Sequence, residues 1–240
     1  MKKVLFVSGA SSDVGTTLIE HIADEYDKIL CHYRNRTEKI DRLRSIFGDR
    51  IIALQADLSE QSQTIQLAKD ISGYGVTHFV HLPAKSSSPE RFIKQGWNPF
   101  ADEINISLRS AVVLASELLP LMAKAGFGRV VFMLTAYTYN EPPQKFMAPY
   151  VAGKYALLGL MKSLAAEYAG KGVTINGVSP GMMDTSFWEG TKRLIIEQNA
   201  EKSPIKRNLT PTDLIGTFEL LLSDSSSCVT GQNIAVTAGA

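Results

Sequence analysis

The sequence predicts one α/β domain built on a doubly wound, seven-stranded parallel sheet with helices on both faces. Short apolar runs recur along the 240 residues, and helical patterns separate them. Continuous runs of this length suit strands that are buried on both faces, and their alternation with helices favours a parallel sheet. No linker, repeat or composition shift marks a second domain within residues 1–240. The expected strands are 4–7, 29–33, 51–55, 77–82, 129–134, 173–178 and 234–236.

Composition narrows the expected partners and compartment. The formal net charge is +1, so no strong field favours nucleic acid or an anionic membrane as a partner. The N-terminal apolar run is too short for a signal peptide, and no apolar stretch stands out as long enough to span a membrane. Cys31 and Cys228 form no disulfide framework. We therefore expect a cytoplasmic protein with no membrane partner.

The first strand leads into a glycine-containing turn, Ser8 to Gly15, which opens a helix through about residue 25. A strand, a turn and a helix N-terminus together form an anion site, because free N–H groups and the helix dipole favour phosphate. Gly9 permits the tight turn, and Gly15 permits close approach of helix to strand. Small polar turns of this kind also occur without a nucleotide. The expected phosphate-binding residues are Gly9, Ser11, Ser12, Asp13, Val14 and Gly15.

The second strand ends at Arg34, and no acidic residue occurs between Lys28 and Thr37. An acidic residue there would accept from the ribose of NAD, whereas an arginine can hold the 2′-phosphate of NADP. We therefore expect NADP(H) in preference to NAD(H), the alternative being that Arg34 is simply solvated. Asp57, after the third strand, either accepts from an adenine amino group or caps a helix that begins near Ser59.

Two histidines lie in the fourth strand, and we expect no metal site from them. His78 and His81 are three residues apart, so they face opposite sides of the sheet. Asn105 lies inside a long predicted helix, residues 97–124, flanked by isoleucines. An amide at such a place is normally exposed, although apolar neighbours also allow a buried and specific role.

Tyr150 and Lys154 are about one helical turn apart and project from one helix face. A phenol has an ordinary pKa near 10, and a fixed positive charge lowers it, so the pair suits proton transfer to an alcohol or carbonyl oxygen. Alone the pair is a weak signal, because the chain has eight tyrosines. Thr135 ends the fifth strand, where a hydroxyl meets ligands of open α/β sheets.

Together these motifs resemble the short-chain dehydrogenase/reductase family, in its 3-oxoacyl-acyl-carrier-protein reductase-like branch. The resemblance spans essentially all 240 residues and implies a Rossmann-type fold. It rests on the order and spacing of the turn at 8–15, Asp57-Leu58, Asn105, 128–131, Tyr150 with Lys154, 179–181, 203–207, Pro211 with Asp213, and 230–232.

The resemblance implies a role for each matching residue. Tyr150 would donate the proton to a substrate carbonyl, Lys154 would lower the pKa of that tyrosine and bind the nicotinamide ribose, and Thr135 would orient the carbonyl. Asn105 would hold a water in a proton relay. Leu58, Pro83, Pro180 and Gly181 would contact the cofactor. Residues 182–204 would form a mobile substrate lid, whose apolar side chains indicate either a partly apolar substrate or plain lid packing.

Three positions depart from the family pattern. Asp13 stands where the family has the middle glycine of its turn, and a carboxylate near pyrophosphate repels it unless it points away or caps the helix. His81-Leu82-Pro83-Ala84 replaces Asn-Asn-Ala-Gly, so two amides that support the sheet are lost. Thr135 replaces a serine, and the gap to Tyr150 is longer than usual, so Tyr137 or Thr138 competes for the serine's place.

The sequence thus predicts an NADP(H)-dependent oxidoreductase that interconverts a small-molecule ketone and a secondary alcohol. An alternative is a dinucleotide-binding sensor or scaffold that has lost useful turnover, which the three departures suggest. A second enzymatic alternative is an NAD-linked alcohol dehydrogenase. The resemblance also implies a homo-oligomer, a tetramer or dimer that packs the helices of Asn105 and Tyr150 against partner copies.

Overall fold

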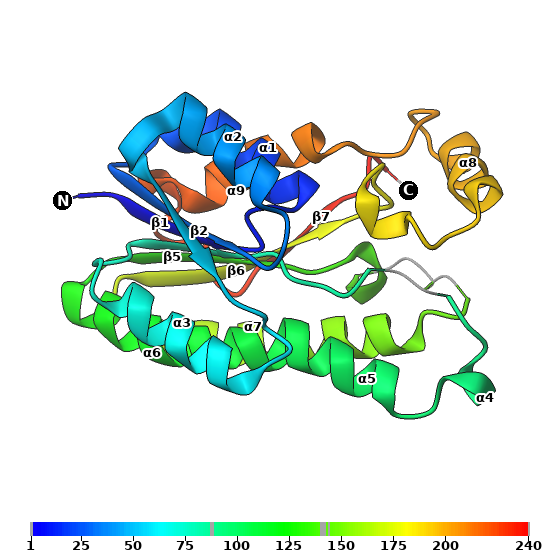
Figure 1. Cartoon of the computed structure of the whole chain (residues 1–240), viewed down its shortest axis with the longest axis horizontal. Helices are drawn as coiled ribbons and strands as arrows, with labels where there is room; N and C mark the ends of the chain where they lie inside the picture. The colour runs from blue at the N-terminus through cyan, green and yellow to red at the C-terminus, as the bar shows by residue number, and fades with distance from the viewer. Residues whose placement is uncertain (1, 87–88, 140–142, 144, 240) are drawn as a thin grey trace.

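A computed structural model describes residues 2–86, 89–139, 143 and 145–239 and contains one parallel sheet of seven strands (Figure 1). The strand order is β3-β2-β1-β4-β5-β6-β7, and every pairing is parallel. This confirms the predicted fold class. The strands are β1 Val4–Ser8, β2 Lys28–Tyr33, β3 Ile51–Gln55, β4 His78–His81, β5 Gly128–Met133, β6 Val173–Pro180 and β7 Asn233–Val236.

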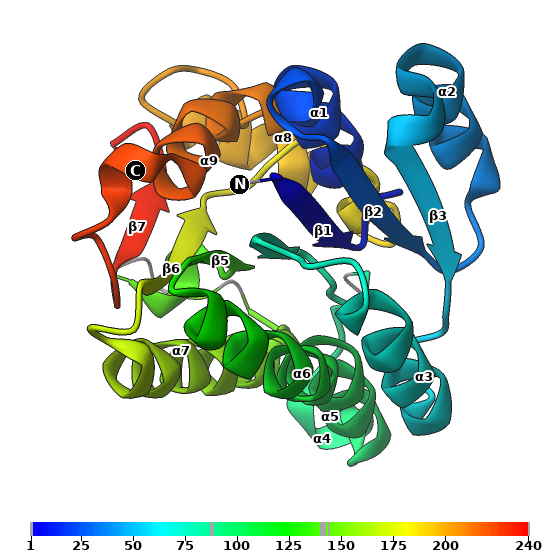
Figure 2. The same ribbon diagram turned by 90° about the vertical axis from the view of Figure 1, so that its left-hand side faces the viewer.

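Helices cover both faces of the sheet (Figure 2). One face carries α1 Asp13–Ile22, α2 Thr37–Phe47 and α9 Ile215–Leu222, and the other carries α3 Gln61–Ser72, α5 Asn98–Glu103, α6 Ser110–Ala125 and α7 Ala148–Tyr168. Each layer buries its own apolar cluster against the sheet. The central strands β1, β4, β5 and β6 are therefore buried throughout, which explains their apolar character, whereas the edge strands β3 and β7 are partly exposed.

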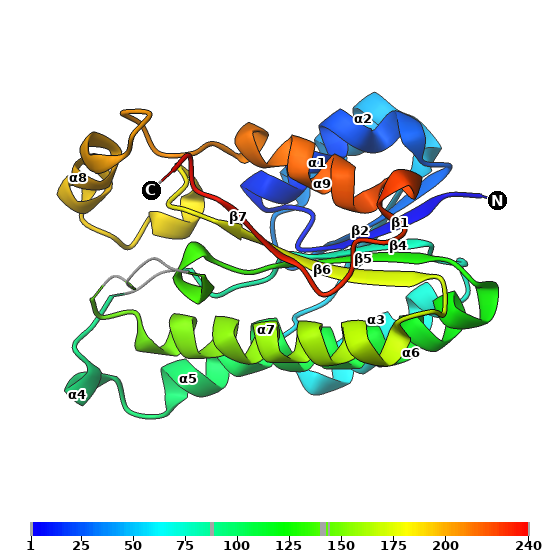
Figure 3. The same ribbon diagram turned by 180° about the vertical axis from the view of Figure 1, so that it is seen from behind.

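The chain reverses its direction of winding at the centre of the sheet. β1 pairs with β2 on one side and with β4 on the other. The connection after β1 therefore runs over one face of the sheet, and the connection after β4 runs over the opposite face. Ligands of open α/β sheets bind beyond the carboxyl ends of the strands at such a point. The short helix α4, Phe92–Gln95, and the helix α8, Arg193–Lys202, lie at this end of the molecule (Figures 1 and 3).

The predicted helix 97–124 is three consecutive segments, α5, a π-helical stretch Ile104–Arg109, and α6. The combined run Asn98–Ala125 has a mean hydropathy of 1.5 over its most apolar window. By length and composition alone it could cross a membrane, so the prediction that no such stretch exists was wrong. The run contacts α3 and α7 and contributes buried side chains to the core, so packing explains its apolar character.

Close approach of α1 to the β1 turn depends on Gly15. A Cβ built at Gly15 would lie 2.7 Å from the Gly9 oxygen and 2.8 Å from the Ala10 oxygen. Both are backbone atoms and cannot rotate away. Gly9 itself has φ +78°, a left-handed conformation that other residues rarely adopt. The two glycines therefore set the distance between the strand end and the helix.

We predict that Gly15→Ala lowers the free energy of unfolding by about 1–3 kcal/mol or more, because the new methyl group overlaps fixed backbone. Gly216→Ala in α9 is the matched control, since a Cβ there meets nothing within 4 Å. Urea unfolding measures both variants. Equal stability of Gly15→Ala and the wild type would contradict the close packing described.

Candidate active site

The turn at residues 8–15 forms a helix N-terminus that faces the end of the sheet. Ser12 caps α1, and its Oγ accepts a hydrogen bond from the Gly15 N–H at 3.0 Å. The Ser12 hydroxyl oxygen is thus already bonded to the first turn of the helix. The remaining N–H groups of the first turn are those that a helix end offers to an anion.

Asp13 follows the cap, and its carboxylate makes two contacts. Oδ1 pairs with Lys39 Nζ at 2.5 Å, and Oδ2 accepts from the Ser186 N–H at 2.7 Å. Burial alone would raise the pKa of Asp13, but the bonds from Lys39 and Ser186 lower it below its usual value. The carboxylate is therefore charged and paired with a cation. Asp13 would not repel a pyrophosphate if it pointed away or capped the helix. It does not cap the helix, because Ser12 fills that role.

His32, at the end of β2, connects the turn to two strands. Its Nδ1 accepts from the Gly9 N–H at 3.0 Å, and its Nε2 lies 3.0 Å from the Ala56 oxygen. Burial lowers the pKa of His32 to about 4, so the imidazole is neutral and donates through Nε2. In the sequence, the one signal of this role was a polar residue near a strand end.

Asp57 closes a turn and does not cap a helix. Its Oδ1 accepts from the N–H and Oγ of Ser59 at 2.9 and 2.7 Å, and α3 begins only at Gln61 with Glu60 as its N-cap residue. The expected helix start near Ser59 is therefore corrected. Arg34 is exposed and lines the same cleft as Asp57.

His81 takes over the supporting role of the amides that this chain lacks. The imidazole is fully buried; Nδ1 lies 2.8 Å from Ser8 Oγ and Nε2 lies 2.9 Å from the Ser107 oxygen. Burial lowers its pKa to about 3, so the ring is neutral, and Nε2 donates to the carbonyl while Nδ1 accepts from the hydroxyl. One side chain thus ties β1 and β4 to the π-helical segment.

Tyr150, Thr135 and Lys154 come together beyond the ends of β5 and β6. The Thr135 hydroxyl hydrogen-bonds the Tyr150 side chain. Lys154 Nζ donates to the Met133 oxygen at 2.8 Å and lies 5.7 Å from the centre of the Tyr150 ring. Among the alternatives, Thr138 Oγ1 instead donates to the Thr135 oxygen at 2.7 Å. Thr138 is therefore bonded to the backbone of Thr135, whereas Tyr137 packs in the same apolar cluster as Tyr150.

Burial changes both pKa values of the Tyr150–Lys154 pair. The pKa of Tyr150 is raised above its usual value by burial, and the Thr135 hydrogen bond opposes this only partly. This direction is opposite to the one expected from the neighbouring lysine. The pKa of Lys154 is lowered to about 8 by burial, and Glu103 opposes that shift. Tyr150 is consequently a protonated phenol at neutral pH, which suits a proton donor.

Asn105 does not join this group. It lies in the π-helical segment, and its Oδ1 accepts from the Arg109 guanidinium at 2.9 Å. The polar side chains that face α7 from this run are Glu103 and Ser107, both buried. The π-helical turn rotates the residues after Ile104 relative to a regular α-helix, and the relay role of Asn105 came from the family resemblance alone. An acid and a serine four residues apart in an apolar run were the available signal.

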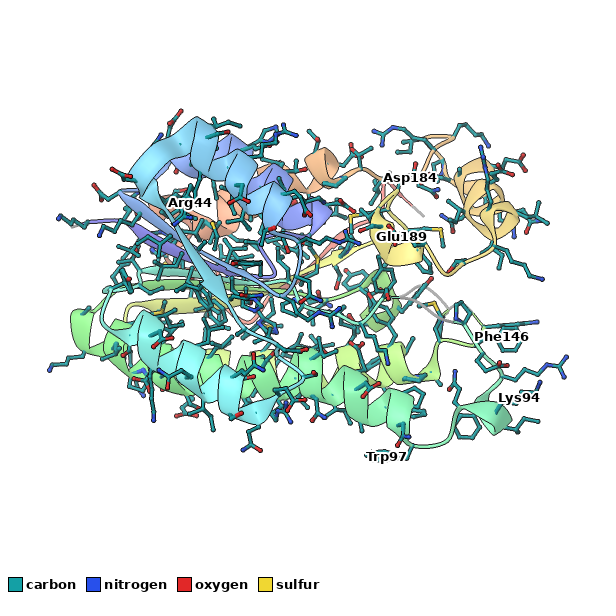
Figure 4. All side chains as sticks on the ribbon, in the orientation of Figure 1. Arg44, Lys94, Trp97, Phe146, Asp184 and Glu189 are labelled. Carbon is teal, nitrogen blue, oxygen red and sulfur yellow. The ribbon has the colours of Figure 1, made fainter. Side chains whose placement is uncertain are left out.

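The segment 182–204, which the sequence predicts to be a lid, packs on Tyr150. The Phe187 and Tyr150 rings have centroids 5.2 Å apart, and Met182 and Trp188 are buried in the same cluster. Arg36 Nη1 donates to Ser186 Oγ at 3.1 Å, and Arg36 Nη2 lies 3.8 Å from a carboxylate oxygen of Glu189. At this end of the molecule, Figure 4 shows Glu189 and Asp184 on one side and Phe146 and Lys94 on the other.

One cleft of about 670 Å³ joins these parts, a size that suits a bound cofactor. Gly15 does not line it, since it packs behind the turn, and neither does Asn105. No cluster of three metal-ligating side chains occurs within the described ranges. The predicted residues that line the cleft are Gly9, Ser11, Ser12, Asp13, Val14, Arg34, Asp57, Leu58, Pro83, Thr135, Tyr150, Lys154, Pro180 and Gly181.

The fold and this cleft agree with a match of residues 9–240 to a family model described as enoyl-(acyl carrier protein) reductase. The chain belongs to the short-chain dehydrogenase/reductase family and is an NAD(P)-dependent oxidoreductase. It is 25% identical over 243 residues to 3-oxoacyl-(acyl-carrier-protein) reductase FabG of Staphylococcus epidermidis, covering 100% of this chain and 99% of that protein.

Solved structures show the same architecture. A structure from Beutenbergia cavernae, described as an NAD(P)-dependent gluconate 5-dehydrogenase with bound NADP, has a TM-score of 0.91 at 25% identity and covers 99% of this chain and 96% of its own. The 3-ketoacyl-(acyl-carrier-protein) reductase of Brucella melitensis, complexed with NADH, has a TM-score of 0.87 at 20% identity, covering 99% and 97%. At 20% identity, the likeness to the Brucella melitensis structure shows the fold alone.

We predict that stability falls as pH is lowered from about 6.5 to 5. Burial lowers the pKa of His32 and His78 to about 4 and of His81 to about 3, so these rings stay neutral in the folded chain while the unfolded chain binds protons below about pH 6.5. The contribution is complete above that pH and is lost below it. Each imidazole contributes up to about 1.4 kcal/mol per pH unit.

Urea unfolding at pH 7, 6 and 5 measures this slope. His81→Asn should reduce the slope by about one proton, whereas His21→Asn, at an exposed position of α1, serves as the control. A free energy of unfolding that is flat over this range would contradict the assignment of neutral buried imidazoles.

Proposed function

We propose that this protein is an NADP(H)-dependent reductase that converts a ketone to a secondary alcohol, with Tyr150 as the proton donor. The observation that carries the proposal is the group of Tyr150, Thr135 and Lys154 in one cleft with the phosphate-binding turn. The raised pKa of Tyr150 favours the reductive direction, because the phenol carries its proton at neutral pH.

The residues of the cleft fit a nicotinamide dinucleotide. Gly9 and the N-terminus of α1 form a turn open to a pyrophosphate, and the Asp13 carboxylate is already paired with Lys39. Arg34 stands at the end of β2, where a ribose 2′-phosphate would lie. Pro180 and Gly181 line the cleft on the side of Tyr150. When bound, the nicotinamide supplies the hydride.

The chain's own residues then position and protonate the substrate. The Thr135 hydroxyl and the Tyr150 hydroxyl both address a carbonyl oxygen, which polarises it and fixes its distance from the cofactor side of the cleft. Tyr150 transfers its proton to that oxygen as negative charge develops on it. The Lys154 ammonium next to the phenol stabilises the phenolate that remains.

The apolar cluster of the lid bears on the substrate class. Met182, Phe187 and Trp188 cover Tyr150, and Phe187 contacts its ring. A carbonyl compound with an apolar portion next to the ketone would bury that portion against these side chains. We therefore propose a partly apolar, small-molecule ketone as the substrate.

We also propose that the protein acts as a homo-oligomer, a dimer or tetramer, in the cytoplasm. The outer surfaces of α6 and α7 expose Val112, Leu121 and Tyr155. Apolar side chains on neighbouring helices suit a contact between copies.

NADPH should bind at least about tenfold more tightly than NADH, because Arg34 forms a charge-assisted hydrogen bond with the 2′-phosphate. Fluorescence titration of both cofactors measures the ratio. Arg34→Ala should remove the preference, whereas Arg44→Ala, on the exposed part of α2, should leave it in place. Equal wild-type affinities would refute the NADP assignment.

Tyr150→Phe should abolish reduction across a panel of ketones, a loss of about 100-fold or more, because no other acid replaces the phenol. Cofactor affinity should change little. Tyr155→Phe makes the same change on an exposed position of the same helix and should retain activity. A wild-type protein that binds cofactor and reduces no carbonyl compound would favour a sensor or scaffold.

A further inference from the structure

Glu103 is a buried carboxyl group next to the Tyr150–Lys154 pair, and the reaction proposed above gives it no role. Only 2% of its surface is exposed. It ends α5 and faces α7, where a Cβ built at Gly153 would lie 2.6 Å from Glu103 Cγ. The absence of a side chain at Gly153 therefore lets Glu103 reach the helix turn that carries Tyr150 and Lys154.

Two neutral donors hold the carboxylate in place. Ser107 Oγ donates to Oε1 at 2.9 Å, and the Lys85 N–H donates to Oε2 at 3.1 Å. The Lys85 ammonium pairs instead with Asp102. Among the described residues no cation forms an ion pair with Glu103.

A second, smaller cavity of about 300 Å³ is lined by Glu103, which does not line the main cleft. Tyr150 and Glu103 both line it, whereas Lys154 lines only the main cleft, as does Thr135. The titratable groups that interact with Glu103 are Lys154 and Tyr150 of α7 and Lys85 of the segment after β4; Glu90 and Lys94 also line the smaller cavity. The nearest buried cation without a carboxylate partner is Lys154.

We propose that Glu103 is a positioning residue of the reaction, whose buried carboxylate is the counter-charge that keeps the Lys154 ammonium protonated next to Tyr150. The inference rests on the proposed function for its catalytic meaning. Burial of a lone ammonium is unfavourable, and a carboxylate nearby reduces that cost. Burial is the larger cause for both groups, so the pKa of Lys154 is lowered to about 8 and that of Glu103 is raised, and each group partly opposes the shift of the other.

The first measurement needs neither substrate nor cofactor. In protein with ¹⁵N-labelled lysine, the Nζ signal of Lys154, assigned with Lys154→Arg, should titrate near pH 8. In Glu103→Gln, which keeps the shape of the side chain, the midpoint should fall by about one pH unit or more. Glu219→Gln, at an exposed position of α9, should leave the midpoint unchanged. An unchanged midpoint in Glu103→Gln would overturn the proposal.

The second measurement is the pH profile of ketone reduction. The alkaline limb of kcat should move to lower pH in Glu103→Gln by the same amount, with KM and the affinity for NADPH within about twofold of the wild type. Glu103→Asp should return part of the shift. A uniform loss of kcat at every pH, with no displacement of the limb, is the result of a purely structural role and would overturn the proposal.

Failure of the proposed function can be distinguished from failure of the role proposed for Glu103. If no ketone is reduced by the wild type, the proposed function fails while the lysine titration still decides the role of Glu103. If Glu103→Gln does not fold, Ser107→Ala removes one hydrogen bond to the carboxylate and should lower the Lys154 midpoint by a smaller amount. No shift in Ser107→Ala would then count against the proposal.

Discussion

The structure depends on the close contact between α1 and the end of β1. A parallel sheet leaves all its carboxyl ends at one edge, and the reversal between β1 and β4 opens a space there. Gly9 and Gly15 let the first helix begin directly at that edge, so its N-terminus, the ends of β4 to β6 and the lid meet around one cleft. A larger residue at Gly15 would displace the helix and with it one wall of the site.

Neutral imidazoles provide the polar connections that hold this edge together. His32 bonds the glycine turn to the chain after β3, and His81 bonds β1 to the helical run. Each ring donates with one nitrogen and accepts with the other, which requires the uncharged form. His81 therefore makes these bonds at a position where the family pattern has an amide.

The sheet could be predicted from the sequence because its central strands β1, β4, β5 and β6 are buried throughout, and such strands favour runs of apolar residues. The cleft residues could be predicted because strand ends and a helix N-terminus collect at one edge. Asn105 could not be separated from Glu103 and Ser107, because the π-helical turn changes which side chains face α7. The contact of Asp13 with Ser186 joins residues 173 positions apart, and no local pattern reports such a pairing.

The ion pair between Asp13 and Lys39 has a consequence for how this chain tolerates change. Since the helix dipole and the ammonium both favour the carboxylate, removal of Lys39 alone leaves a negative charge at the position of an incoming pyrophosphate, and removal of Asp13 alone leaves an unmatched positive charge. The effects of the two substitutions are therefore not additive. A change at Asp13 or Lys39 therefore alters the surroundings of the other side chain, and a change at Asp13 also removes the bond to the Ser186 N–H.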